Sequence, residues 1–197
     1  MNRLALLLLP LTLWPSPVTA SPLPIVAVLD SGVDLDCLAS VNFTGDGDAD
    51  LCGHGTEMGI IIRAADCQLL DVKIADDNGM VWASDLAAGI VWAADNGANY
   101  INISASLPAD ETKVIAEAVA YAVSRGVVVI AADIAAIPSY PACYSGVIAC
   151  SPKGDLAASE ATAYRTFLEV QKGVTYHAFD TEGELGTGGG LVGPKPR

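Results

Sequence analysis

Asp30 and His54 are the two residues whose types and positions could carry out chemistry. Asp30 directly follows the apolar run Ile25–Leu29, and His54 lies between Gly53 and Gly55, which allow the backbone to come close. An aspartate that orients a histidine, and a histidine that takes a proton from a hydroxyl, are two parts of a serine nucleophile system. On spacing alone a structural alternative stays open, in which Asp30 caps a turn and His54 caps a helix.

The pattern of apolar residues predicts the strands and helices that hold these two side chains. Ile25–Leu29 is a continuous apolar run rich in β-branched residues, as expected of a strand buried on both faces of a parallel sheet. Functional side chains gather at the carboxyl ends of such strands, which is where Asp30 falls. The further candidate strands are Leu69–Ile74, Tyr100–Ile103, Val127–Ile130 and Val147–Ala149.

Three helices are expected between these strands. The first is His54–Arg63, the second is capped by Ser84 and runs to Asn96, and the third is Asp110–Arg125. Strands that alternate with helices of this length form βαβ units, so the sequence predicts an α/β fold. We expect a doubly wound, mainly parallel sheet with helices on both faces. Beyond about residue 152 the pattern weakens.

The two ends of the chain differ from its middle. Arg3 precedes the apolar run Leu4–Trp14, and Val18-Thr19-Ala20 offers the small residues of a cleavage site, so residues 1–20 are expected to be an export signal. A membrane anchor is the alternative, but this run falls short of the roughly 20 residues that span a bilayer. We expect one domain over residues 21–182, a loose glycine- and proline-rich tail over 183–197, and a periplasmic or extracellular location.

Composition excludes several classes of protein. With 52% hydrophobic and 17% charged residues, the chain is unlike a disordered segment, a coiled coil or a collagen-like fibre. The net charge of −13 would repel phosphate backbones and anionic lipid headgroups. We therefore expect neither a nucleic-acid partner nor a membrane partner.

The chain contains five cysteines, an odd number in a protein expected to reach an oxidising compartment. Cys37 with Cys52 would close a loop of about 15 residues, worth roughly 3 kcal/mol in the chain-entropy model. Cys143 with Cys150 would bracket a turn, and Cys67 would be left over. These are candidate disulfides. A zinc site formed by Cys37, Cys52, His54 and Cys67 is the alternative, but the short CxxC spacing typical of zinc sites is missing.

Asp46, Asp48 and Asp50 alternate and form a candidate metal site. With Glu57 they match the ligand spacing of an EF-hand loop. The sixth position, however, is Leu51 rather than the required glycine, so a solvated acidic turn is the alternative. We expect that no cofactor is required, with structural calcium as an option.

Several motifs in register resemble the subtilisin-like serine proteases, or subtilases. Val26–Val33 (VAVLDSGV) is similar to the aspartate motif of this family, and Gly53–Thr56 (GHGT) with Gly59 is similar to its histidine motif. The resemblance extends in order from about residue 24 to residue 150. Its further segments are Leu70–Lys73, Asp77–Gly79, Ser84–Ser104, Ala118–Val129, Tyr140–Ala142 and Gly146–Ala149.

The resemblance implies a function and a set of roles. It implies that the protein is an endopeptidase homologue that binds a peptide or protein, with Asp30 and His54 as the catalytic aspartate and histidine. It also implies that Ser104-Ala105-Ser106 is the segment that pairs with the substrate backbone.

The sequence departs from the family where the nucleophile belongs. The family places its serine in a GTSMAxP motif that begins a buried helix, and the similar stretch here is Gly186–Gly190, with Gly188 at the serine position. The oxyanion asparagine is also missing, because Asp133 or Ile134 occupies its place. Loss of the nucleophile costs about a million-fold in rate in a hydrolase of this type. The interpretation is therefore an inactive homologue or binding protein.

Three alternatives to that interpretation stay open. Thr187, one residue from the expected serine position, could substitute for it. The chain could be a truncated or frameshifted copy of an active serine endopeptidase. It could also be an acidic exported scaffold or binding domain without a peptide groove.

Overall fold

The computed structural model describes residues 23–134 and 137–180. The expected export signal, Thr187, Gly188 and the glycine- and proline-rich tail lie outside the described residues. Six strands are present in this part of the chain: β1 (Ile25–Asp30), β2 (Ala39–Asn42), β3 (Gln68–Lys73), β4 (Tyr100–Ile103), β5 (Val128–Ala132) and β6 (Val147–Cys150). The helices are α1 (His54–Arg63), α2 (Ala83–Asp95), α3 (Val114–Ser124) and α4 (Ala158–Asp180).

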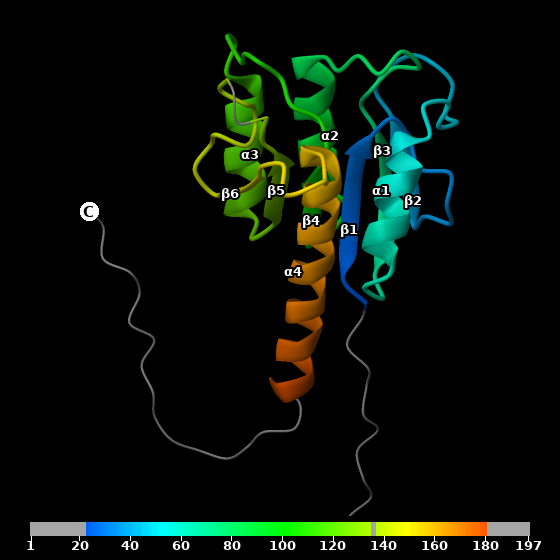
Figure 1. The fold of residues 1–197 in the computed structure, drawn as a ribbon, viewed down its shortest axis with the longest axis vertical. Helices are drawn as coiled ribbons and strands as arrows, with labels where there is room; N and C mark the ends of the chain where they lie inside the picture. Colours follow the sequence, from blue (N-terminus) through cyan, green and yellow to red (C-terminus); the bar gives the residue numbers. More distant parts are fainter. Residues whose placement is uncertain (1–22, 135–136, 181–197) are drawn as a thin grey trace, which may run out of the picture.

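The strands form one parallel sheet in the order β2-β3-β1-β4-β5-β6. β1 lies in the middle, with Asp30 beside Lys73 of β3 and Leu29 beside Ile103 of β4. The last residues of three neighbouring strands therefore meet at the carboxyl edge of the sheet, which is the upper edge in Figure 1.

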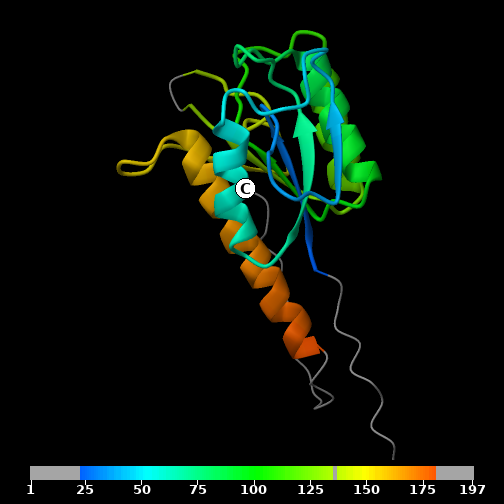
Figure 2. The same ribbon diagram turned by 90° about the vertical axis from the view of Figure 1, so that its right-hand side faces the viewer.

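Helices cover both faces of this sheet, as Figures 1 and 2 show. The alternation of side chains along β1 explains the two layers. Val26 and Val28 pack in the apolar cluster that contains residues of α1 and α4. Ala27 and Leu29 point the other way, into the cluster with α2 and α3. The predicted α/β fold, doubly wound with helices on both faces, is confirmed.

Besides α3, which begins at Val114 rather than at Asp110, three features of the fold differ from the predictions. β2 was not predicted, because a four-residue edge strand with only half-buried and exposed side chains lacks a buried apolar run. Ser84 does not cap α2: the helix begins one residue earlier, and the Ser84 hydroxyl donates to Asp85 Oδ1 at 3.0 Å. The third difference is α4, a 23-residue helix in the region where the apolar pattern weakens.

α4 packs against the sheet through one narrow stripe of side chains. Thr162, Ala163, Thr166 and Val170 are fully buried, whereas the neighbouring residues on the opposite side are exposed. Two of these four residues are threonines, which do not count as apolar in a hydropathy pattern. None of the described helices is apolar over a length that would cross a membrane.

Candidate active site

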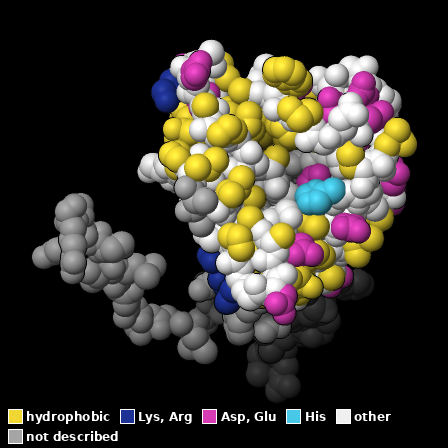
Figure 3. All heavy atoms as spheres, turned by 45° about the horizontal axis from the view of Figure 1, so that its top comes forward, with side chains coloured by type: hydrophobic (Ala, Val, Ile, Leu, Met, Phe, Trp, Pro, Cys, Tyr) yellow, Lys and Arg dark blue, Asp and Glu magenta, His cyan; other side chains and the backbone are white. Residues whose placement is uncertain are grey.

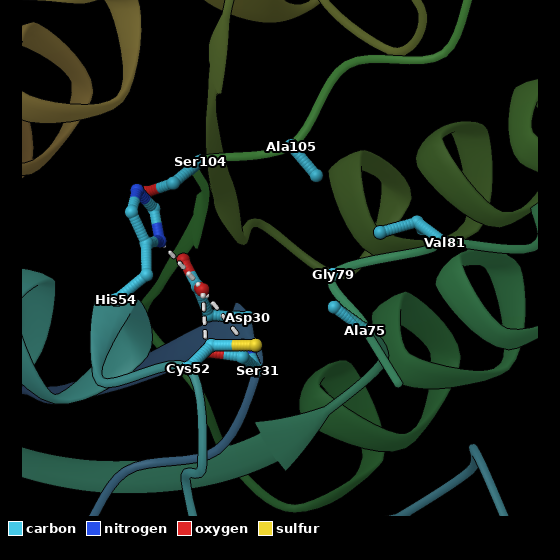
Figure 4. Close-up of a pocket in the computed structure, with 9 residues that line it drawn as sticks. All are labelled: Asp30, Ser31, Cys52, His54, Ala75, Gly79, Val81, Ser104 and Ala105. Carbon is cyan, nitrogen blue, oxygen red and sulfur yellow. Dashed lines mark hydrogen bonds and ion pairs between the residues drawn. The ribbon is translucent and has the colours of Figure 1, made fainter. Parts of the chain in front are cut away.

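The structure brings Asp30 and His54 together at the carboxyl edge of the sheet. Asp30 ends β1 and is 5% exposed, and His54 is the first residue of α1. The imidazole Nδ1 lies 2.7 Å from Asp30 Oδ1 (Figure 4). This geometry orients the ring and leaves its second nitrogen, Nε2, available to exchange a proton with another group.

Glycine is required on each side of His54, for a different physical reason at each position. Gly53 precedes the helix with φ at 77°, in the left-handed region that glycine adopts without strain. At Gly55 an added Cβ would lie 2.1 Å from the carbonyl oxygen of Gly32. Only glycine therefore lets α1 approach the loop that follows β1 closely enough for His54 to meet Asp30.

Asp50 fixes this close approach through its two carboxylate oxygens. Oδ1 accepts hydrogen bonds from the Ser31 hydroxyl at 2.7 Å and from the Gly53 N–H at 2.9 Å. Oδ2 accepts from both the hydroxyl and the N–H of Thr56. The Ser31 hydroxyl oxygen in turn accepts the Gly55 N–H at 3.1 Å. Asp50 is thus a structural support of the site that the sequence analysis assigned only to a metal.

The Asp30 carboxylate changes the acid–base behaviour of His54. The hydrogen bond from His54 to Asp30 raises the pKa of the imidazole above 6.5, and it outweighs the opposite effect of burial. The charge of Asp30 acts in the same direction. An imidazole with a raised pKa is a better proton acceptor, which is the property that a general base needs.

A cavity of about 230 Å³ lies beside the pair. Figure 4 shows the Ser104 side chain directed toward His54, with Ala105 next to it along the chain and farther from the ring. Both residues follow β4 directly, so the sheet brings them to Asp30 as the sequence predicts. Ser106, the third residue of that segment, does not line the cavity. The residues that line the cavity are Asp30, Ser31, Cys52, His54, Ala75, Gly79, Val81, Ser104 and Ala105.

The site opens to the surface on the carboxyl edge of the sheet. Figure 3, which brings this edge forward, shows the histidine side chain at the surface beside acidic side chains. The side chain of His54 is 40% exposed, whereas that of Asp30 is 6% exposed. The imidazole is therefore accessible from solvent, while the carboxylate next to it is shielded from water.

The three aspartates of the candidate metal site bind different partners. Asp46 Oδ2 accepts the Asp77 N–H at 2.9 Å, and Asp48 Oδ1 accepts a proton of the Asn42 amide at 3.1 Å. Both oxygens of Asp50 accept hydrogen bonds from Ser31, Gly53 and Thr56. No three His, Cys, Asp or Glu side chains in the described part of the chain are grouped to hold a metal ion. A calcium site at this acidic turn stays a prediction.

The two expected disulfides are not formed, since all five cysteines are free thiols. Cys37 packs against the apolar cluster between the sheet and α1, whereas the Cys52 thiol lies 3.5 Å from the Asp77 carbonyl oxygen. Cys150 is buried at the end of β6, and Cys143 is exposed in the preceding turn. Each thiol of a predicted pair thus has different neighbours from its expected partner.

Asp133 follows β5 at the same edge of the sheet, where the resemblance implies a neutral amide donor. Its N–H donates to the Cys150 carbonyl at 3.0 Å, and its Oδ2 accepts the Ser151 hydroxyl at 2.9 Å. Whether Asp133 or Ile134 occupies the place of that donor stays a prediction.

The sequence analysis missed the first turn of α4, which lies near this edge. Glu160 accepts a hydrogen bond from the Ala157 N–H at 2.8 Å, as the glutamate of a capping box does at the start of a helix. The signal in the sequence was the spacing of small residues and threonines at 159, 162, 163 and 166, which is the period of a helix.

Comparisons with known proteins show similarity to several subtilisin-like proteases. No protein-family model matches the chain. Subtilisin Savinase from Lederbergia lenta is 33% identical over 148 residues, which cover 63% of this chain and 53% of that protein. The thermophilic serine proteinase from Bacillus sp. (strain AK1) is 35% identical over 149 residues, 63% of this chain and 37% of that protein.

The solved structures show the same fold. Sphericase superposes with a TM-score of 0.66 at 20% identity, over 80% of this chain and 79% of that chain. The part of the chain that matches the curated relatives spans about half of their length or less. With the aspartate and histidine motifs in register and the fold in common, the chain is a partial match to the subtilisin-like serine proteases.

Proposed function

We propose that the protein is an exported serine endopeptidase that cleaves peptide bonds in protein substrates, with Asp30 and His54 handling the proton. The observation that carries the proposal is the 2.7 Å contact between Asp30 Oδ1 and His54 Nδ1 beside an open cavity. Relatives that are named proteases support the same function.

In the proposed reaction the imidazole is the general base. The Nδ1–H group donates to Asp30, so the lone pair of Nε2 is free to accept a proton from an attacking hydroxyl. Asp30 stabilises the imidazolium that forms, and for this reason the pKa of His54 is raised. The segment Ser104-Ala105-Ser106 continues past Ile103, the last paired residue of β4, and would align the substrate backbone along the cavity.

Hydrolysis of casein and of a fluorogenic peptide tests the proposal. We expect turnover by the purified chain and a loss of about 10³-fold or more in His54→Ala and Asp30→Asn, because each removes part of the proton-transfer system. Asp36→Asn, at a side chain that is 98% exposed, is the matched control and should leave turnover unchanged. Absence of turnover in the wild-type chain, or full turnover in His54→Ala, would contradict the proposal.

A second candidate function is a peptide-binding homologue without turnover, and Asp133 favours it. A carboxylate at the end of β5 would repel the negative charge that develops on the substrate oxygen. A neutral donor at such a place contributes about 3–4 kcal/mol to catalysis. Peptide binding by fluorescence anisotropy, without hydrolysis, would support this candidate, and Asp133→Asn should then raise turnover above background.

Export is the remaining part of the proposal. Residues 1–20 have the pattern of a secretory signal, and one relative, 32% identical over 160 residues, is named a minor extracellular protease. Mass spectrometry of the secreted or periplasmic product should find Ser21 at its N-terminus. A product that keeps Met1 inside the cell would contradict this location.

A further inference from the structure

α4 runs antiparallel to β4 and is fixed to it by two side-chain contacts. The Tyr100 hydroxyl donates to the Glu169 carbonyl at 3.2 Å, and the Thr166 hydroxyl donates to Asn102 Oδ1 at 2.9 Å. A later residue of β4 therefore lies beside an earlier residue of α4. The start of α4 must accordingly lie near the carboxyl end of β4, where the cavity is.

The register between the two elements can be extended from Thr166 to Ser159. Ser159 lies seven residues before Thr166. Seven helical residues rise about 10 Å and return to nearly the same face. Along β4, Ser104 lies two residues beyond Asn102, which is about 7 Å toward the carboxyl edge. Ser159 therefore lies about 3 Å beyond the level of Ser104, which lines the cavity.

The buried stripe of α4 shows that Ser159 faces the sheet. Thr162 and Ala163, three and four residues after Ser159, are fully buried, and Ser159 itself is half-buried. Residues three and four apart share one helix face. The Ser159 hydroxyl thus lies on the side of α4 that is turned toward the sheet rather than toward solvent.

α1 and α4 lie side by side and both begin at the carboxyl edge (Figures 1 and 2). Met58 and Ile62 of α1 share an apolar cluster with Ala163 and Val170 of α4. His54 is the first residue of α1, and Ser159 is the second residue of α4. The imidazole and the hydroxyl are therefore presented by the first turns of two adjacent helices.

We infer that Ser159 supplies the attacking hydroxyl of the site, in place of the residue expected at 188. This inference rests on the proposed function. In the structure the His54 side chain has a hydrogen bond to Asp30, and Ser159 is not among the residues that line the cavity. The inference requires Ser159 to meet His54 when substrate binds. Catalytic hydrogen bonds commonly tighten only in the complex with substrate.

The proposed reaction has two stages, acylation of Ser159 and hydrolysis of the resulting ester. Ser159 Oγ forms a bond to the carbonyl carbon of the substrate, and its proton passes to His54 Nε2. The carbon–nitrogen bond then breaks, and the leaving amine takes that proton. Water then attacks the resulting ester, and one of its protons passes to His54. When the ester bond breaks, His54 gives that proton to Ser159 Oγ and the carboxylic acid product leaves. The N–H groups in the first turn of α4 have no partners within the helix and can stabilise the developing oxyanion.

Ser104 is the rival hydroxyl, because Figure 4 shows it beside His54. Its oxygen already accepts a proton of the Asn102 amide at 2.9 Å. It also belongs to the segment proposed to align the substrate, so its hydroxyl lies along the substrate backbone rather than at a helix start. Ser104→Ala therefore tests the rival directly, because it removes the other hydroxyl that lies near His54.

A fluorophosphonate probe, which forms a covalent bond to an activated serine, tests the inference. Peptide mapping by mass spectrometry should place the label on Ser159. Labelling should be lost in Ser159→Ala and kept in Ser104→Ala, and Ser159→Ala should lower casein turnover by about 10³-fold or more. Equal thermal melts by circular dichroism would show that both variants fold.

The outcomes separate this inference from the proposed function. A label on another serine, or turnover that survives in Ser159→Ala but is lost in His54→Ala, would overturn the role of Ser159 and leave the endopeptidase function intact. A label on Ser159 without casein turnover would support the inference and overturn the endopeptidase function. No label at all would overturn the role of Ser159.

Discussion

Asp50 and Thr56 are joined twice: the hydroxyl and the N–H of Thr56 both donate to Asp50 Oδ2, at 2.7 and 2.9 Å. In Asp50→Asn one of the two carboxylate oxygens is replaced by an NH2 group, which cannot accept a hydrogen bond. The hydroxyl and N–H groups that donate to that oxygen therefore lose their acceptor. We expect a loss of about 2–4 kcal/mol in the free energy of unfolding. Tm measured by calorimetry should fall by about 5–15 °C, and turnover should fall with it because His54 is set by the same turn.

Asp48→Asn is the control for this change, since Asp48 is exposed and accepts a hydrogen bond from Asn42. It should alter stability by less than about 0.5 kcal/mol. Burial alone would raise the pKa of Asp50, but the hydrogen bonds from Thr56, Ser31 and Gly53 hold it below its usual value. The stabilisation should therefore be lost as the pH falls through that lowered pKa. Equal stability of Asp50→Asn and Asp48→Asn near neutral pH would contradict this role.

The hydrogen bond between His54 and Asp30 predicts the pH dependence of turnover. His54 acts as a base only when neutral, and its pKa is raised above 6.5 mainly by that hydrogen bond. We expect kcat/KM to rise with pH along a limb whose midpoint lies above 6.5. In Asp30→Asn the limb should move down toward pH 6.5 while the maximum rate falls. A midpoint that does not move would show that Asp30 does not control the protonation of His54.

Asp71 is a buried carboxylate in β3 that stabilises the protein only while it is protonated. It is 8% exposed, its Oδ1 has no hydrogen-bond partner, and burial raises its pKa to about 7. The folded protein therefore keeps a proton that the unfolded chain releases near pH 4, so stability declines as the pH rises from about 4 to about 7. Asp71→Asn should raise Tm by about 3–8 °C at pH 8 and change it little at pH 4.5.

Asp66→Asn is a suitable control for Asp71→Asn. Asp66 is exposed and has φ at 53°, a conformation that asparagine tolerates well. We expect its effect on Tm to be small and the same at both pH values. An equal gain for Asp71→Asn at pH 4.5 and pH 8 would show that packing, rather than charge, limits stability at this position.

Much of the fold follows from local pattern, and the exceptions have physical causes. The central strands β1 and β4 were predicted because both of their faces are buried, which demands a continuous apolar run. α4 was missed because its buried stripe includes Thr162 and Thr166, whose hydroxyls are satisfied by the Ala158 and Thr162 carbonyls and by Asn102. Such threonines look polar in the sequence and are buried only because the fold gives them acceptors.

Only those parts of the candidate site were predicted whose residues lie at the ends of strands. Asp30 and Ser104 fall at the ends of β1 and β4, so their proximity follows from a parallel sheet. The role of Asp50 depends on its contacts with Ser31 and Thr56, which come from separate segments. Alternation of acidic residues suggested a metal instead, because sequence spacing does not reveal which N–H groups a carboxylate will meet.

The free thiols give a direct prediction for chemical modification. Cys52 and Cys143 are exposed, whereas Cys37 is half-buried and Cys67 and Cys150 are buried. Burial raises the pKa of Cys37 and of Cys67 to about 11, so few thiolates are present at pH 8. We expect Ellman's reagent to react quickly with two thiols of the native protein and with all five in denaturant without a reductant.

Single replacements identify the fast thiols. Cys52→Ser and Cys143→Ser should each remove one fast equivalent, because an exposed thiol reacts through its own thiolate and not through a neighbour. Cys67→Ser should remove one slow equivalent and leave the fast phase unchanged. Three or fewer thiols in denaturant would mean that a disulfide has formed. Such a result would place Cys37 beside Cys52, or Cys143 beside Cys150, and so require a loop arrangement different from the one described.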